Sequence, residues 1–191
     1  MIHLLKVVDG LALPEKHRKL LRPDEPVIDP QGRSHRLPRY FYEVTSWEQA
    51  RATKLTVHFT LAELMAVDCR EADLLLRQFP HYIPCAVSVL ARYLEEFRER
   101  AEAPMMISVN GGYRSPAHRY SGTISPHLWA TAADIYRIGD TWLDSEKSID
   151  RYARIAESIG QEVFAMPYGC GTGETDDHLH VDIGYLSVVP R

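Results

Sequence analysis

The sequence predicts an α+β fold in a single domain. Helical and strand-like segments are interspersed without the regular alternation that a parallel sheet requires. The chain has 191 residues, which suits one domain of ordinary size and leaves little room for two. Hydrophobic residues make up 45% and charged residues 25%, both near the globular average, so wholesale disorder and fibrous architectures are excluded.

Residues 1–52 are predicted to form a proline-rich N-terminal extension. Prolines are concentrated before residue 40 and alternate with charged clusters such as residues 15–19. This composition is more typical of an extended arm or a cover segment than of a core element. A compact domain is therefore expected over residues 53–191.

Three segments of the compact domain have helical patterns. Thr60 and Glu63 have the spacing of a capping box, and the apolar residues that follow predict a helix to about residue 78. A second helix is expected after Pro84, with an apolar stripe formed by Val87, Leu90, Ala91, Leu94 and Phe97. Residues 145–159 predict a third helix, which stops at Gly160.

The strand candidates are short and come late in the chain. Residues 105–109 are expected to form a strand that leads into the turn-forming cluster at residues 110–112. Residues 162–166 and 179–183 are the remaining candidates. Helices that precede and separate scattered strands indicate the α+β class.

Charge, cysteine content and hydropathy exclude several functional classes. A net charge of −4 gives no reason to expect nucleic acid or an anionic lipid surface as a partner. Cys69, Cys85 and Cys170 show no C-x-x-C spacing, so no thiolate zinc cluster is indicated, while a bridge between Cys69 and Cys85 stays open. There is no secretory-leader pattern and no apolar stretch of membrane-spanning length. We therefore expect a protein without a transmembrane segment, either cytoplasmic or released by lysis or another non-classical route.

Two clusters contain the residue types that bind metals. His127 and Asp134 lie among small and apolar residues, where an ionised carboxylate needs a cationic partner. Further on, His178 and His180 follow Asp177, and in a strand both imidazoles project from the same face. Taken singly, each cluster is more typical of a hydrogen-bonded structural pair. Together they offer His, Asp and His, which leave the fourth position of a zinc ion open for water, as in catalytic sites.

The motifs around these residues resemble those of the zinc D-alanyl-D-alanine carboxypeptidases. Relatives of that family include vancomycin-resistance dipeptidases and phage L-alanyl-D-glutamate endolysins, and its fold is shared with the hedgehog signalling domain. The family motif S-x-H-x-x-G-x-A-x-D is matched except that Ala130 replaces the glycine, and the matching residues are Ser125, His127, Ala132 and Asp134. The motif S-G-Y-R-S is matched at residues 111–115 with its first serine replaced, and the H-x-H-V-D ending at residues 178–182 is typical of the carboxypeptidase branch. The resemblance covers about residues 57–184.

The resemblance implies a small antiparallel sheet with flanking helices and a role for each site residue. Zn²⁺ is expected on His127, Asp134 and His180, where it would lower the pKa of a bound water to about 7. Asp177 and His178 are the expected catalytic pair: Asp177 takes the proton of the water and His178 donates to the oxyanion, although the two could exchange roles.

Three further residues have implied roles near this site. Arg114 and Ser125 are expected to bind a carboxylate or carbonyl of the substrate. Asp182 either orients a ligand imidazole or caps a structural turn. His58 and His118 are expected to be, respectively, a structural or capping residue and a surface-loop residue.

The predicted function is that of a zinc metallopeptidase acting on peptides of the cell wall that contain D-amino acids. The substrate would be a peptide derived from peptidoglycan, and removal of a terminal D-alanine is the first choice. A peptidoglycan endopeptidase of the endolysin type is the enzymatic alternative. A zinc-binding interaction module without significant catalysis is the third interpretation: Ala130 favours it, whereas the retention of Asp177 and His178 speaks against it. The oligomeric state is left open.

Overall fold

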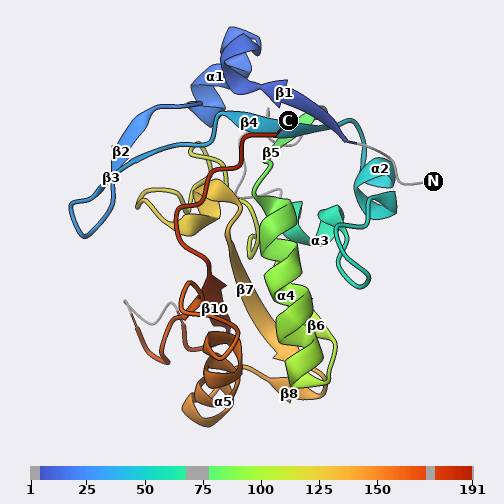
Figure 1. The fold of residues 1–191 in the computed structure, drawn as a ribbon, viewed down its shortest axis with the longest axis vertical. Coiled ribbons are helices and arrows are strands. Elements are labelled where there is room, and N and C mark those ends of the chain that lie inside the picture. The colour runs from blue at the N-terminus through green and yellow to red at the C-terminus, as the bar shows by residue number, and fades with distance from the viewer. Residues whose placement is uncertain (1–4, 68–77, 171–174, 191) are drawn as a thin grey trace.

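The computed structural model describes residues 5–67, 78–170 and 175–190. This part of the chain has an α+β fold, in which helices accompany small antiparallel sheets, as the sequence predicts (Figure 1). None of its helices is long and apolar enough to cross a membrane.

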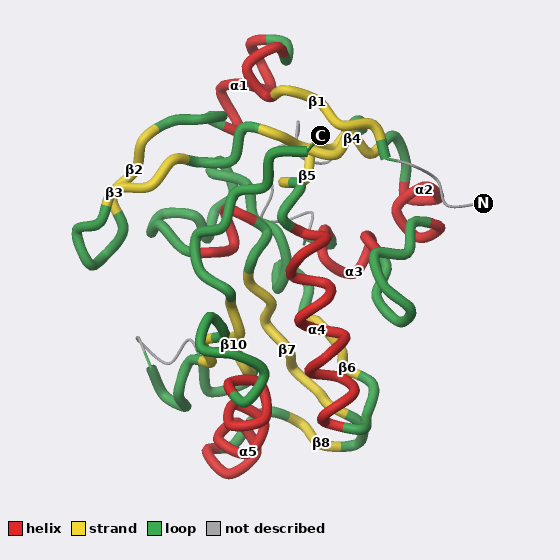
Figure 2. The backbone as a smooth tube through the Cα atoms, in the orientation of Figure 1, coloured by secondary structure: helices red, strands yellow, loops and turns green. Residues whose placement is uncertain are grey.

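The largest sheet lies in the second half of the chain and positions the candidate site. Its strands follow the order β6-β7-β10-β9, and β8 pairs with the C-terminal end of β7. All of these pairs are antiparallel. The strands are β6 (Met105–Ile107), β7 (Ala132–Ile138), β8 (Thr141–Trp142), β9 (Phe164–Ala165) and β10 (Leu179–Asp182). In Figure 2, β7 and β10 run beside each other at the centre of the molecule.

Two amphipathic helices pack on this sheet. Helix α4 (Val87–Ala101) buries all five residues of the predicted apolar stripe, and helix α5 (Glu146–Glu157) buries Ile149, Tyr152 and Ala156 in the same core. Ser145 caps α5 by accepting a hydrogen bond from the backbone N–H of Ser148. Both helices are confirmed.

The predicted strands at residues 105–109, 162–166 and 179–183 are confirmed as β6, β9 and β10, each shorter than expected. Strand β7 was not predicted, because its first residues, Ala132, Ala133 and Asp134, have low strand propensity.

The predicted helix to residue 78 is wrong for the described residues that follow Met65. Helix α3 (Leu61–Met65) has the expected capping box but ends there, because Ala66 takes an extended conformation with ψ 120°. The remainder of that prediction, at residues 68–77, lies outside the described residues.

The N-terminal segment contributes regular elements. Strands β1 (Lys6–Asp9), β4 (Tyr40–Val44) and β5 (His81–Pro84) form a three-stranded antiparallel sheet, and β2 (Pro26–Ile28) pairs with β3 (Ser34–Arg36) in a hairpin. The 3-10 helix η1 (Gly10–Ala12), α1 (Glu15–Leu21) and α2 (Trp47–Ala52) complete this part of the chain.

The expectation of an arm without core elements is wrong for β4 and α2. Val44 and Ala50 are fully buried in the main core, and β4 pairs with β5, which lies within the compact domain expected over residues 53–191. The division of the sequence at residue 52 stays a prediction.

Candidate metal centre

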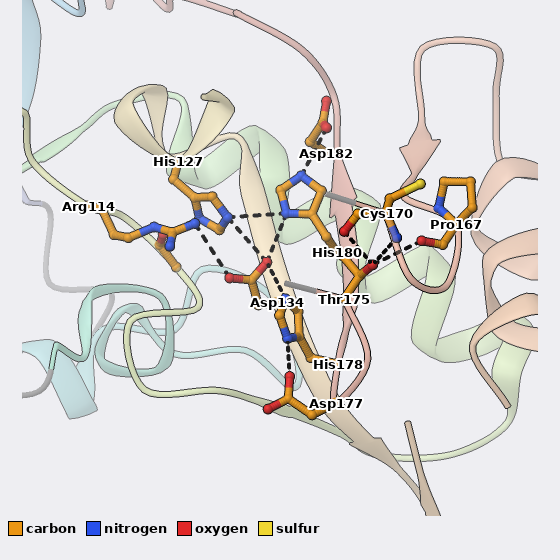
Figure 3. Close-up of polar contacts among 11 residues, drawn as sticks. Arg114, His127, Asp134, Pro167, Cys170, Thr175, Asp177, His178, His180 and Asp182 are labelled. Carbon is orange, nitrogen blue, oxygen red and sulfur yellow. Dashed lines mark hydrogen bonds and ion pairs between the residues drawn. The ribbon is translucent and has the colours of Figure 1, made fainter. Parts of the chain in front are cut away.

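Three buried side chains meet where β7 and β10 pair. His127 comes from the 3-10 helix η3 (Pro126–Trp129), Asp134 from β7 and His180 from β10, where the strand register places it opposite Asp134 (Figure 3). The Oδ1 atom of Asp134 lies 2.8 Å from Nδ1 of His180 and 3.2 Å from Nε2 of His127, and these two nitrogens are 3.2 Å apart. All three residues could offer ligand atoms to one metal ion, since these atoms lie within 4.8 Å of one another.

The outer nitrogen of each imidazole is already engaged. Nδ1 of His127 lies 2.7 Å from the carbonyl oxygen of Gly112, and Nε2 of His180 lies 3.1 Å from Oδ2 of Asp182. Both partners are acceptors, so in a neutral ring they hold the proton on the outer nitrogen and leave the lone pair of the inner nitrogen available to a metal ion. Outer hydrogen bonds of this kind orient histidine ligands in metal sites.

The electrostatics of the cluster favour a cation at its centre. Burial alone would raise the pKa of Asp134, but the charges and hydrogen bonds of His127 and His180 outweigh it and lower the pKa well below the ordinary value. Burial lowers the pKa of His127, which favours its neutral form. Burial alone would also lower the pKa of His180, but hydrogen bonds with Asp134 and Asp182 raise it to about 9. Without a metal, the protonated ring of His180 supplies the cation that the buried carboxylate of Asp134 needs, and a metal ion would replace that proton. Two nitrogens with one carboxylate oxygen form a donor set that suits zinc.

The predicted catalytic pair lies beside this cluster. Nε2 of His178 is 3.7 Å from Oδ1 of Asp134, and its Nδ1 is 2.7 Å from Oδ1 of Asp177. The side chain of His178 is 21% exposed and that of Asp177 is 86% exposed. The imidazole of His178 therefore lies next to the centre, and the carboxylate of Asp177 contacts this imidazole from the solvent side.

Arg114 and Ser125 are placed differently with respect to the cluster. A guanidinium nitrogen of Arg114 lies 3.5 Å from Oδ2 of Asp134, and the backbone N–H of Arg114 donates to the carbonyl of His127 at 3.2 Å. Ser125 is half-buried at the N-cap position of η3, two residues before His127, and makes no capping hydrogen bond with its side chain. Among the described residues, six of the seven predicted site residues contact one another through their side chains, and Ser125 stands apart from them.

Two positions of the sequence motifs have clear backbone roles: Ala130, which replaces the usual glycine of the first motif, and Gly112, the usual glycine of the second. Ala130 ends η3 in the left-handed region, with φ 56° and ψ 37°, and is fully buried. That conformation explains why glycine is usual there. Gly112 lies so close to α3 that a Cβ atom would be 2.2 Å from the carbonyl oxygen of Leu64.

Several residues around the site were not assigned from sequence or were assigned differently. The carbonyl of Gly112 gives no sequence signal, because any residue has one. Asp182 fulfils both of its alternative roles, since it also accepts a hydrogen bond from the backbone N–H of Gly184 at 2.8 Å. The expectation that His118 lies on a surface loop is wrong: it is 4% exposed, with Nε2 3.1 Å from Oδ1 of Asn110.

Comparison with known proteins agrees with the fold and with this cluster. Residues 57–182 match the family model described as peptidase M15. No curated protein and no solved structure matches the chain. Peptidases of this family depend on zinc, and the match covers both halves of the candidate centre together with the loop of Arg114. The resemblance to zinc peptidases of the D-alanyl-D-alanine carboxypeptidase type is thereby confirmed. The chain belongs to the peptidase M15 family of zinc-dependent peptidases.

Proposed function

We propose that this peptidase hydrolyses peptide bonds in cell-wall peptides that contain D-amino acids, and that it removes a terminal D-alanine. His127, Asp134 and His180 hold the zinc ion in this proposal. The observation that carries it is the buried carboxylate of Asp134 between two imidazoles whose outer nitrogens are already engaged. When bound, zinc supplies a Lewis acid that activates water and polarises the carbonyl of the scissile bond.

His178 and Asp177 act as a proton-transfer pair. The hydrogen bond of 2.7 Å to Asp177 fixes the ring of His178 and directs its Nε2 toward the centre. From this position His178 donates to the oxygen that gains charge during attack on the carbonyl. Asp177 takes the proton of the attacking water and passes it to the leaving amine, for which its carboxylate must turn toward the centre from the solvent side, where it binds Nδ1 of His178. The contact between the two residues also supports an exchange of these roles.

Arg114 supports the choice of a carboxypeptidase. Its guanidinium borders the centre at Asp134, and a guanidinium binds a carboxylate through two parallel hydrogen bonds. A free C-terminal carboxylate is what distinguishes the substrate of a carboxypeptidase from that of an endopeptidase. Ser125, at the start of η3, offers a hydroxyl to the same end of the substrate.

The competing functions are separated by the products that the zinc-loaded protein forms from peptidoglycan fragments. We expect mass spectrometry to show the loss of one alanine from fragments that end in D-alanyl-D-alanine. Cleavage inside the stem peptide or the cross-link would instead indicate an endopeptidase. Intact fragments would contradict the enzymatic proposal and favour a zinc-binding interaction module.

Asp177→Ala tests the assigned proton transfer. We expect it to keep the zinc and to lose activity by at least roughly a hundredfold, since general acid–base groups contribute about 10²- to 10⁴-fold. Asp176→Ala is the matched control, because Asp176 is also an exposed carboxylate in the same turn. Unchanged hydrolysis by Asp177→Ala would remove Asp177 from the mechanism.

A further inference from the structure

The 3-10 helix η3 has two buried sides. On one side His127 points into the candidate metal centre, where it is 1% exposed. On the other side Leu128 and Trp129 are 2% and 0% exposed and belong to a separate apolar cluster. A 3-10 helix of four residues has little stability of its own. The position of His127 therefore depends on what holds the opposite side.

The β2-β3 hairpin holds that opposite side. Val27 and Leu37, at the two ends of the hairpin segment, form the cluster with Leu128 and Trp129. The indole N–H of Trp129 donates to the backbone carbonyl of Arg36 at 3.0 Å, a contact between residues 93 positions apart. The hairpin thus contacts η3 through both packing and a directional hydrogen bond.

The hairpin is internally fixed by one buried carboxylate. Asp29 accepts hydrogen bonds from the backbone N–H groups of Gln31 at 2.9 Å and of Arg33 at 2.8 Å. Its second oxygen lies 2.6 Å from Nε of Arg33 and 2.9 Å from Nε2 of His35. A loop with this many hydrogen bonds to one side chain keeps a defined shape.

An aromatic contact closes the hairpin around Trp129. The ring centroids of His35 and Tyr185 are 4.1 Å apart. The ring centroids of Tyr185 and Trp129 are 4.9 Å apart, and the two rings meet at an interplanar angle of 76°. Tyr185 follows β10, the strand of His180, by three residues. The hairpin is therefore connected to η3 directly and to the end of β10 through Tyr185.

The residues that pack against η3 in these contacts lie outside the part of the chain that matches the peptidase family. The match covers residues 57–182, whereas the hairpin segment and Tyr185 fall before and after it. We define residues 26–37 together with Tyr185 as the clamp.

We propose that the clamp is a positioning element for His127: it holds η3 from the side opposite the metal and thereby sets the zinc affinity of the centre. The inference rests on the proposed zinc ligands. It assigns a purpose to the N-terminal segment that the family match leaves unexplained. The residues of the clamp act through Trp129 and do not touch the zinc or the substrate.

Two leucine-to-alanine variants test the clamp. Leu37 is 1% exposed in the clamp cluster, and Leu21 is 4% exposed in a different cluster, with Leu13, Phe41 and Tyr82. Both substitutions remove the same buried side chain from the N-terminal segment. Zinc affinity is measured by competition with a chromophoric chelator, and the unfolding of the metal-free proteins is followed in parallel.

We expect Leu37→Ala to weaken zinc binding about tenfold, as for the loss of groups that orient a ligand. Leu21→Ala should change zinc affinity by less than about twofold, because it is independent of the site. Equal losses of affinity in the two variants, or none in Leu37→Ala, would overturn the proposal. Leu37→Met, which keeps the apolar volume, should restore the affinity of the parent protein.

A milder variant covers the case in which Leu37→Ala does not fold. Trp129→Phe keeps an aromatic ring but removes the N–H that binds the carbonyl of Arg36. It should also weaken zinc binding, and parental affinity in this variant would contradict the clamp. Because zinc affinity is measured without substrate, a parent protein that binds zinc but cleaves nothing would refute the proposed function and leave this test intact.

Discussion

The close approach of Gly112 to α3 gives a sharp test of how the candidate centre is built. In Gly112→Ala the new Cβ atom would lie 2.2 Å from the carbonyl oxygen of Leu64 and 2.6 Å from its carbonyl carbon. Carbon–oxygen contacts of this kind are normally about 3.3 Å or longer, so one backbone segment must move by roughly 1 Å. Neither atom belongs to a flexible side chain that could turn away.

The cost of that movement follows from the bonds it breaks. Overpacking a tight site costs about 1–3 kcal/mol. The backbone N–H of Tyr113 donates to the carbonyl of Leu64 at 2.8 Å, and losing that bond adds about 1 kcal/mol. We therefore expect the metal-free protein to lose roughly 2–4 kcal/mol of unfolding free energy.

The same movement displaces the carbonyl that orients His127. Nδ1 of His127 lies 2.7 Å from the carbonyl oxygen of Gly112, so a shift of this size breaks the hydrogen bond. Zinc affinity should fall about 10- to 100-fold, as for other losses of groups that orient a metal ligand. Thermal unfolding and chelator competition measure the two effects separately.

Gly122→Ala is the matched control, because its Cβ atom would meet nothing within 4 Å. It should leave the stability and the zinc affinity close to those of the parent. If Gly112→Ala also retained both, the described path from α3 through Gly112 to His127 would be wrong.

Three further substitutions probe the surroundings of the site. Asp182→Ala removes the partner of Nε2 of His180, so we expect chelator competition to show a loss of zinc affinity of about 10- to 100-fold; an unchanged affinity would count against that orienting role. Ala130→Gly stabilises the protein by relieving a left-handed conformation that costs alanine about 1–2 kcal/mol. It also destabilises the protein, because it removes a buried methyl worth about 0.8 kcal/mol and gives the unfolded chain more backbone freedom. Denaturant unfolding should therefore show a net change under about 1 kcal/mol. A loss well above that would mean that the methyl has a packing role of its own. Burial alone would raise the pKa of Asp29, but hydrogen bonds from His35 and Arg33 lower that pKa below its ordinary value. The ionised carboxylate therefore stabilises the fold above the pKa that Asp29 has in the unfolded chain, and this contribution is lost as the pH falls below about 4. Asp29→Asn should flatten the acid side of the stability profile, and identical slopes below pH 4 for both proteins would refute this linkage.

The sequence predicted the parts of this protein whose signal is local. The apolar stripe of α4 and the capping residue Ser145 of α5 are periodic or adjacent patterns, and both are found in the structure. The residues of the candidate centre were also found from spacing, since His127, Asp134 and His180 meet as the motif resemblance implied.

Contacts with the backbone of distant segments could not be predicted from the sequence. The carbonyls of Gly112 and Arg36 hold His127 and Trp129 from far along the chain, and a carbonyl carries no residue-type signal. The prolines of the N-terminal segment led to the wrong prediction of an arm for a different reason. Pro14 precedes the first turn of α1 and Pro26 opens β2, positions where proline is tolerated, so they mark the ends of elements instead of their absence.

The most direct test of the account is a zinc titration of the metal-free protein, with hydrolysis of a D-alanyl-D-alanine peptide as the readout. The account predicts that activity rises in proportion to added zinc and levels off at about one ion per chain, and that His127→Ala stays inactive over the same range. Hydrolysis that persists without zinc, or a His127→Ala variant that titrates like the parent, would contradict a zinc peptidase built on His127, Asp134 and His180.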